Sequence, residues 1–296
     1  MGEQKILVRT GEIFLKSSFV FRQMRAQLIG NLKREFRKRK LNVSVYLEEQ
    51  RIILKSEKAD QERISDILRH TFGVVSFSFL EETEPEITKI KTVSEMIASR
   101  WKKGTTFAVH TKRIDKSFRY KSRQINEIIG SHISGMGYKV DLSNPDNVLY
   151  IEIGKNAILF DNKIYGPGGL PLSSAPIFSQ LDTEKDIVAT WFIMKRGFKP
   201  MLGISSKKKL VKMLERWSIG HSFSFVENPL NNFNDTEPLK KGSNDKTQKI
   251  KAIIISDTDI TRIDKIKKMR KHFLVLTPLV GMNADDIEEK LRFLYM

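Results

Sequence analysis

Cysteine is absent from this chain of 296 residues. The polypeptide therefore has no disulfide, no thiolate ligand for zinc or an iron–sulfur cluster, and no cysteine nucleophile. Its five histidines are scattered, without the His-x-x-x-His or comparable spacing of a zinc site. No apolar run is as long as a membrane-spanning helix, and the N-terminus lacks the apolar core of a secretory signal. We expect a cytoplasmic protein with no metal site and no membrane partner.

Acidic residues are outnumbered by basic ones. The chain has 52 lysines and arginines against 35 aspartates and glutamates, a formal net charge of +17. Such an excess predicts a polyanionic partner and carries no information on the fold. RNA, DNA and an anionic membrane are all polyanions, and the membrane is the weakest candidate because no spanning or anchoring segment is visible. With 40% hydrophobic residues and this length, we expect two or three domains with proper cores.

The most informative segment spans residues 106–153. An alternating apolar strand runs into a basic stretch that also contains Phe118 and Tyr120, and a helix-period stretch and a strand at 148–153 follow. We predict a strand, a cationic loop, a helix and a returning strand that hold positive charge in a fixed arc. Nucleic-acid phosphate is the natural counterpart, and a solvated surface loop is the alternative. The candidate RNA-binding residues of this segment are Lys112, Arg113, Lys116, Arg119, Lys121 and Arg123.

The first 80 residues alternate strands and helices. Their order, strand–helix–strand–strand–helix–strand, is that of a ferredoxin-like domain. Strands are predicted at 5–9, 41–46, 52–55 and 74–79, and helices at 19–40 and 59–70. The first helix ends in more cations than the helix dipole accounts for, so RNA contact is the preferred interpretation of its charge. The candidate residues in and before this helix are Lys16, Arg22, Arg25 and Arg37.

Two segments mark domain boundaries. Residues 81–86 are acidic, contain Pro85 and have weak periodicity, which predicts a linker followed by a helix at 92–103. The segment GPGGLP at 166–171 predicts a tight turn between domains. We therefore expect domains at 1–80, 81–166 and 167–296.

The third part again alternates helices and strands, which predicts an open, mostly parallel sheet. Helices are expected at 182–195, 207–217, 259–270 and 285–294, and strands at 199–204, 222–226, 250–255 and 273–276. Residues 228–249 are predicted to form a surface loop. Four large apolar residues fit either the core of this part or an interface: Trp191, Phe192, Phe198 and Trp217. The fold class is α/β, with an α+β N-terminal half.

Seven short segments, in order along nearly the whole chain, carry a resemblance to a known family. They are GEIFLKS (11–17), FGVVSFS (72–78), KRIDKSFRYKSRQIN (112–126), VDLSNPD (140–146), GPGGLP (166–171), MKRG (194–197) and TPLVGM (277–282). With them the chain resembles the THUMP-domain proteins of the thiamine-biosynthesis and tRNA 4-thiouridine synthase (tRNA sulfurtransferase) family. The resemblance implies a ferredoxin-like domain and a THUMP domain that together bind the tRNA acceptor stem, and a C-terminal, doubly wound adenine-nucleotide hydrolase-like (Rossmann-like) domain. The sequence leaves open whether the protein forms a homodimer or pairs with a modification enzyme.

The phosphate-binding loop of the active family members has the form Ser-Gly-Gly-x-Asp-Ser. Counting back from Gly197, it falls here on Leu181, Asp182, Thr183, Glu184, Lys185 and Asp186. The glycines of such a loop let backbone N–H groups approach ATP phosphates, and here they are missing while three carboxylates stand in the segment. We predict a degenerate nucleotide site in which Asp182 or Thr183 caps a helix.

The remaining family chemistry is missing too. Active members carry a persulfide on a cysteine, and the region that usually reads Gly-Glu-x-x-Gly-Gln reads DTDITR at 257–262. Asp257 and Asp259 could hold Mg²⁺, although capping of the following helix is the simpler interpretation. We expect no catalytic residue and no cofactor, and hence a tRNA-binding protein without ATP-dependent adenylation or sulfur transfer. The alternative is an active tRNA sulfurtransferase that makes 4-thiouridine with ATP, a rebuilt site and an external sulfur donor.

Overall fold

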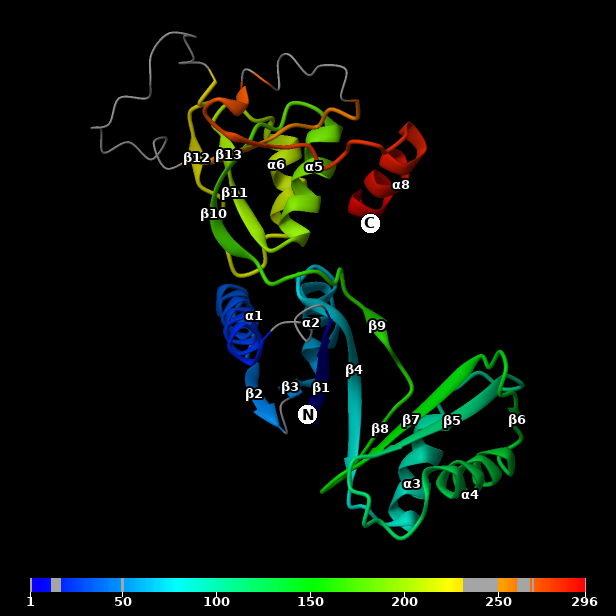
Figure 1. The fold of residues 1–296 in the computed structure, drawn as a ribbon. Coiled ribbons are helices and arrows are strands. Elements are labelled where there is room, and N and C mark those ends of the chain that lie inside the picture. The colour runs from blue at the N-terminus through cyan, green and yellow to red at the C-terminus, as the bar shows by residue number, and fades with distance from the viewer. Residues whose placement is uncertain are drawn as a thin grey trace. The chain divides into compact units, whose positions relative to one another are not determined.

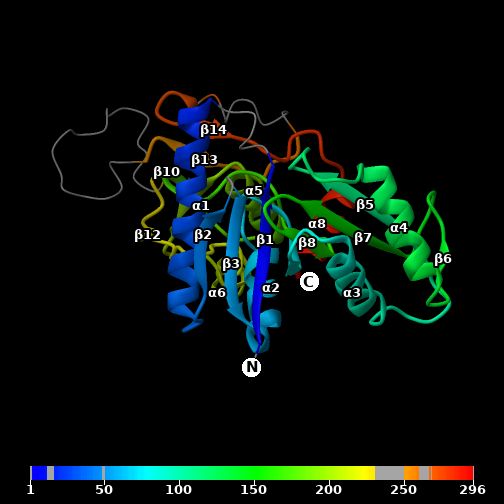
Figure 2. The same ribbon diagram turned by 90° about the horizontal axis from the view of Figure 1, so that it is seen from below.

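Residues 2–11, 17–48, 51–230, 250–259, 267 and 269–295 are described by the structure, a computed structural model. The chain separates into two units, each assembled from three stretches of sequence (Figures 1 and 2). The first unit comprises 1–9, 43–61 and 76–165, and the second comprises 10–42, 62–75 and 166–296. The helices of the first 80 residues therefore group with the C-terminal part of the chain.

The predicted order of the first six elements is confirmed. They are β1 (Glu3–Thr10), α1 (Ser18–Lys38), β2 (Ser44–Glu48), β3 (Arg51–Glu57), α2 (Gln61–Arg69) and β4 (Val74–Thr83). The side chain of Ser17 caps α1 by accepting the Val20 N–H at 3.5 Å, and two cations occupy the last turn, where the helix dipole favours them.

The strands of the first unit form one nine-stranded sheet in the order β2-β3-β1-β4-β8-β7-β5-β6, with β9 also paired to β4. Residues 81–83, predicted to belong to a linker, instead continue β4 and pair antiparallel with β8 (Ala157–Phe160). That prediction is wrong because the acidic side chains are paired. Glu81 binds Arg100 at 2.8 Å and Glu82 binds Lys5, so the strand runs on without unpaired carboxylates.

Two helices cover one face of the THUMP-like part of this sheet. They are α3 (Ile87–Ala98) and α4 (Ser122–Ser134), and the neighbouring strands are β5 (Thr106–Arg113), β6 (Lys139–Val140), β7 (Asn147–Ile153) and β9 (Ile164–Tyr165). The core between helices and strands includes Ile97, Ile129 and Leu149. Helix α3 begins and ends five residues before the predicted 92–103. The chain turns after it at Gly104, which has a φ of +81°, and the Trp101 indole N–H donates to Asp161 at 2.8 Å.

The C-terminal part is an open, five-stranded, wholly parallel sheet in the order β12-β11-β10-β13-β14. Its elements are β10 (Ser173–Ser179), α5 (Glu184–Lys195), β11 (Phe198–Gly203), α6 (Lys208–Glu215), β12 (Phe225–Val226), β13 (Ala252–Ile254), β14 (Leu274–Leu276) and α8 (Ala284–Tyr295). This order reverses between β10 and β13, as in doubly wound folds. The central strand β10 escapes sequence reasoning because it contains Pro176 and its register is interrupted between Ser174 and Phe178.

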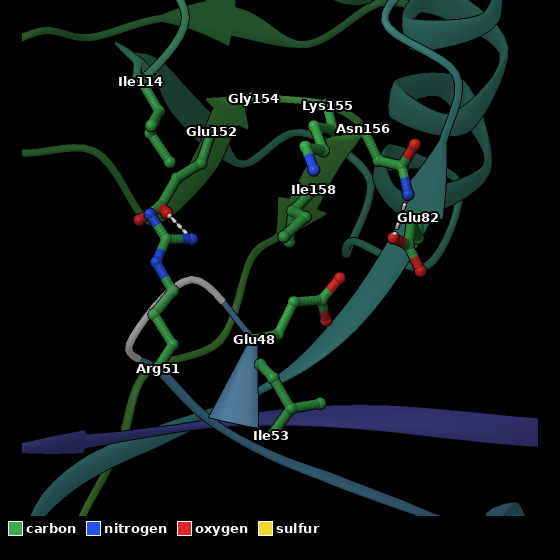
Figure 3. A pocket seen from close by; sticks show the side chains of 10 residues that line it. All are labelled: Glu48, Arg51, Ile53, Glu82, Ile114, Glu152, Gly154, Lys155, Asn156 and Ile158. Atoms are coloured by element: carbon green, nitrogen blue, oxygen red, sulfur yellow. Dashed lines mark hydrogen bonds and ion pairs between the residues drawn. The ribbon is translucent and has the colours of Figure 1, made fainter. Parts of the chain in front are cut away.

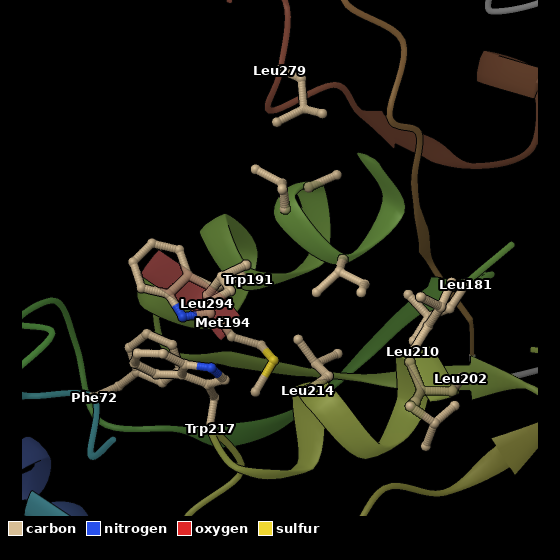
Figure 4. Close-up of a cluster of buried hydrophobic side chains, with 14 of the residues drawn as sticks. Phe72, Leu181, Trp191, Met194, Leu202, Leu210, Leu214, Trp217, Leu279 and Leu294 are labelled. Carbon is tan, nitrogen blue, oxygen red and sulfur yellow. The ribbon is translucent and has the colours of Figure 1, made fainter. Parts of the chain in front are cut away.

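A buried hydrophobic cluster in the second unit contains three packed aromatic side chains among aliphatic ones: Phe72, Trp191 and Trp217 (Figure 4). The rings of Trp191 and Trp217 meet edge to face at 5.4 Å, and Phe72 lies 5.5 Å from Trp191. Both tryptophans are buried, which confirms the core interpretation for these two residues. Phe198 differs, because 46% of its surface is exposed.

Helix α1 is joined to the C-terminal part by polar contacts around the Leu172 carbonyl. This oxygen accepts from the side-chain amides of Gln27 and Asn31, each at 3.0 Å. The His221 Nε2 lies 3.0 Å from Asn31 Oδ1 and 3.1 Å from the Leu172 oxygen. Because both neighbours accept, this nitrogen carries the proton of the neutral ring. Burial lowers the pKa of His221, and the nearby Arg34 lowers it further.

We expect acid to weaken this junction. A histidine whose folded pKa lies below its ordinary 6.5 stabilises the fold fully above that value and loses this contribution as the pH falls through the lowered pKa. The thermal midpoint of the wild type should therefore fall on going from about pH 7.5 to about pH 5.5. In His221→Gln, which keeps an amide donor but cannot titrate, the fall should be smaller. An equal fall in both proteins, followed by circular dichroism, would contradict the assignment.

Candidate nucleic-acid interface and nucleotide loop

The cationic loop, residues 114–121, is held in a defined shape between β5 and α4. The N–H groups of Ile114 and Asp115 both donate to the Ile153 carbonyl, at 2.7 and 3.0 Å, which fixes the start of the loop to the end of β7. The Asp115 carboxylate accepts the hydroxyl and the N–H of Ser117, at 2.6 and 2.8 Å. These hydrogen bonds lower the pKa of Asp115, so the acid stays ionised and keeps the turn closed.

Aromatic side chains anchor the loop while its cations face solvent. Phe118 and Tyr120 pack against the core beneath α4. Lys116, Arg119 and Lys121 are exposed, as is Lys112 at the end of β5. The Arg119 guanidinium lies 5.4 Å from the Tyr120 ring centroid. Helix α4 begins directly after the loop, so its N-terminal N–H groups add to a surface that favours an anion.

The two other candidates of this segment have partners within the chain. Arg113 is half-buried, and its Nη1 donates to the carbonyls of Lys116 and Phe118, at 3.1 and 3.2 Å. Arg123 forms an ion pair with Glu127 at 3.0 Å, and both side chains are largely exposed. A pair of this kind contributes little stability and opens easily toward a stronger anion. Arg113 therefore holds the loop in shape, whereas Arg123 is still able to bind an anion.

The candidates on α1 lie in the second unit. Arg22 and Arg37 are exposed, and the Arg25 guanidinium lies 4.9 Å from the Phe21 ring centroid. Lys16 lies outside the described residues. Part of the cationic excess at the end of α1 is structural, because Arg39 binds Glu35 and Asp66, each at 2.8 Å.

The predicted nucleotide loop, 181–186, lies at the carboxyl end of β10. In doubly wound sheets the ligand crevice forms there, where the strand order reverses. Thr183 is the N-cap of α5, as predicted. The Leu181 side chain is buried and its N–H donates to the Ser206 hydroxyl at 3.1 Å, so the segment is fixed from behind.

The Asp186 carboxylate occupies the donors at this helix start. Its Oδ2 accepts from the Thr183 N–H at 2.7 Å, the Thr183 hydroxyl at 2.9 Å and the Asp182 N–H at 3.0 Å. Its Oδ1 accepts from the Ser256 hydroxyl at 2.5 Å. Ser256 follows β13, so this hydrogen bond joins the first turn of α5, which follows β10, to the segment that follows β13. Backbone N–H groups of the kind that hold a phosphate are thus used by a carboxylate of the chain itself.

A separate pocket of about 360 Å³ lies on the sheet of the first unit (Figure 3). Its residues come from five strands, the β7–β8 turn and Ile114 at the start of the cationic loop, and no sequence pattern links them. Arg51 binds Glu152 at 2.6 Å, and the Asn156 amide donates to Glu82 at 2.6 Å. The charges of this pocket are therefore largely satisfied within it.

Within the described residues, no three histidine, cysteine, aspartate or glutamate side chains are grouped to hold a metal ion. Asp257 and Asp259 are described, but most of the helix predicted at 259–270 is not. No helix in the described part of the chain has the length and apolarity needed to cross a membrane.

Comparison with known proteins agrees with this arrangement. The model of the ThiI ferredoxin-like domain matches residues 5–78, and the model of the THUMP domain matches residues 81–160. A probable tRNA sulfurtransferase of Methanocaldococcus jannaschii is 29% identical over 271 residues, which cover 86% of this chain and 68% of that protein. The probable tRNA sulfurtransferase of Bacillus subtilis is 35% identical over 208 residues, 67% of this chain and 50% of that protein. The chain thus spans about half the length of most curated relatives it matches.

Two solved structures share the fold over 99% of the chain. PH1313 from Pyrococcus horikoshii matches over its whole length with a TM-score of 0.80 and 22% identity. A 4-thiouridine synthetase, solved as an RNA complex with bound ATP, matches over 85% of its length with a TM-score of 0.76 and 20% identity. These two likenesses concern the fold alone. The two matching domain models and the sequence relatives show that the chain is a THUMP-domain protein of the tRNA sulfurtransferase family, with a ThiI ferredoxin-like domain at its start.

Proposed function

We propose that this protein binds tRNA without carrying out the ATP-dependent adenylation and sulfur transfer of its family. One contrast carries the proposal: the cationic loop is ordered and open, whereas the Asp186 carboxylate occupies the donors of the nucleotide loop. The RNA would be the acceptor stem of a tRNA, met in the cytoplasm. Whether the protein acts as a homodimer or beside a modification enzyme can be measured by light scattering and by recovery of its partners.

The loop suits an A-form RNA helix for physical reasons. Double-stranded RNA is recognised mainly by shape, through its phosphates and 2′-hydroxyls. Lys112 at the end of β5 and three exposed cations at 116, 119 and 121, together called the four loop cations, flank or lie on a loop held by the Arg113 and Asp115 hydrogen bonds. They can therefore meet phosphates without the loop first being ordered. Preorganisation of this kind reduces the entropy lost on binding.

Residues 181–186 are, by contrast, unfavourable for the phosphates of ATP. A phosphate would have to displace Asp186 from three hydrogen bonds, and Asp182 and Glu184 add two further negative charges to the same segment. Repulsion between like charges opposes the binding of an anion here. The chain also has no cysteine that could carry a persulfide.

The two halves of the proposal are tested together on the full chain. The affinity for a tRNA transcript should fall with rising salt, with a log–log slope of about −3 or steeper if the four loop cations each neutralise a phosphate. Exchange of labelled pyrophosphate into ATP, in the presence of the same tRNA, should stay at baseline. Salt-insensitive or undetectable tRNA binding contradicts the first half. Pyrophosphate exchange above baseline contradicts the second and favours an active tRNA sulfurtransferase with a rebuilt site.

A further inference from the structure

A groove of about 640 Å³ in the second unit is lined by α1, by the segment that leads into β10 and by the start of β11, and it shares no lining residue with the cationic loop or the nucleotide loop. This volume falls within the range of ~300–1,000 Å³ that is typical of small-ligand sites. On α1 the groove follows residues three and four apart, where Ala26 and Gly30 leave room, and Met24 and Phe198 supply apolar walls. Its lining contains two guanidinium groups, Arg34 and Arg196, and no carboxylate.

Arg34 is fixed so that one of its nitrogens faces this groove. Its Nε donates to the Gly220 carbonyl at 2.8 Å and its Nη2 to Asn31 Oδ1 at 2.5 Å. Its Nη1 lies over Gly30, because a Cβ built on that glycine would be 3.4 Å from this nitrogen. Among the described residues Nη1 has no acceptor. A guanidinium held by hydrogen bonds at two of its nitrogens, with the third nitrogen beside a glycine that lines the groove, is suited to an anionic oxygen.

Phe198 gives the groove a face for a flat ring. It is the first residue of β11, and 46% of its surface is exposed although large apolar residues usually bury theirs. An exposed aromatic ring beside fixed cations is the combination that single-stranded nucleic acid uses, with bases stacked on the ring and phosphates on the cations.

We propose that this groove binds an unpaired nucleotide of the RNA, with the base against Phe198 and the phosphate on Arg34. The assignment rests on the proposed RNA binding and extends it to a second contact of a different kind. An acidic peptide is the competing occupant by charge. The RNA is favoured because α1 continues past the groove with exposed cations, among them Arg22 and Arg37, which suit a repeating phosphate backbone.

The test compares a single-stranded RNA of about twelve nucleotides with a duplex of the same sequence, on the full chain. Phe198→Ala should weaken the affinity for single-stranded RNA about 5- to 100-fold and leave the affinity for the duplex within about twofold of the wild type. The matched control is Phe225→Ala, which removes a ring that is 48% exposed at the start of β12 and should change neither affinity. Ala26→Leu, which fills the groove from an exposed helix position, should reproduce the effect of Phe198→Ala without removing a contact.

Crosslinking locates the base directly. The same single strand carrying 5-iodouridine should crosslink on irradiation to the peptide that contains Phe198. Unchanged single-strand affinity in both Phe198→Ala and Ala26→Leu would overturn the assignment while leaving tRNA binding intact. If these changes weaken the binding of a labelled hexaglutamate peptide and leave the binding of RNA unchanged, the groove is a protein-docking site and the assignment is wrong. Loss of salt-sensitive tRNA binding in the wild type would instead be a failure of the proposed function.

Discussion

Gly169→Ala should be strongly destabilising, by about 3–5 kcal/mol, because two costs act at one position. Gly169 has a φ of +72°, a conformation that costs an L-residue roughly 1–2 kcal/mol. A Cβ at this site would also lie 2.1 Å from the Lys195 carbonyl oxygen and 2.8 Å from the Lys195 Cγ. The Leu170 N–H donates to the same carbonyl at 3.0 Å, so the end of α5 cannot move aside without losing this bond.

Urea unfolding followed by tryptophan fluorescence measures this change, because Trp191 and Trp217 lie in the same core. Gly281→Ala is the matched control. Gly281 has a φ of +89° in the same unit, but a Cβ there would meet nothing within 4 Å, so only the backbone cost of roughly 1–2 kcal/mol applies. Equal losses of stability in the two variants would show that the contact with Lys195 is relieved at no cost.

Neutralising the four exposed loop cations together should weaken tRNA binding roughly 100- to 1,000-fold at about 0.1 M salt. Each phosphate contact contributes close to one unit of salt slope, so the slope should become shallower by about three. The variant replaces Lys112, Lys116, Arg119 and Lys121 by glutamine. Arg113 is kept because its hydrogen bonds hold the loop, and its loss would confuse folding with binding.

The control for net charge replaces four exposed lysines at the N-cap and along α6: Lys207, Lys208, Lys209 and Lys212. Both quadruple variants lose the same formal charge. If binding depends on the loop, only the first should lose affinity strongly. If both lose it equally, long-range attraction by net charge dominates and the loop is not a specific contact. Titration of fluorescent tRNA at several salt concentrations distinguishes the two results.

Sequence periodicity predicted most elements of this fold, because most helices and strands have one clear apolar face. The strand, loop, helix and strand at 106–153 formed as expected, with β5 and β7 parallel. The failures share a cause, which is tertiary compensation of a locally unfavourable residue. Pro176 weakens the signal of β10, yet that strand is central because neighbours on both sides pair with it. Glu81 and Glu82 suggest a linker, yet distant cations keep them in a strand.

The candidate sites could be predicted only as far as residue type goes. Composition identified the cations of the loop but could not separate Arg113, which holds the loop, from Lys116, which faces solvent. The missing glycines indicated a degenerate nucleotide loop. Asp182 or Thr183 was predicted as the cap, and the structure has Thr183 there. The hydrogen bond from Ser256 to Asp186 joins residues 70 positions apart. It forms because β13 lies next to β10 in the sheet, which no local sequence pattern indicates. The groove at Phe198 has no local signature, because its walls come from three separate segments.

Asp186 links two properties that are independent in most helices. It accepts from the Asp182 and Thr183 N–H groups just before α5, and under the proposed function it takes the place that a phosphate would need. A substitution that removes the Asp186 carboxylate therefore also removes hydrogen bonds at the start of α5. A substitution that keeps these hydrogen bonds leaves the N–H groups occupied. Introducing glycines alone would not free these N–H groups either. The Asp186 carboxylate belongs to the same chain, so its local concentration is high and it would outcompete a free ligand. Under the proposed function, nucleotide binding at residues 181–186 would therefore require the glycines and the removal of Asp186 together.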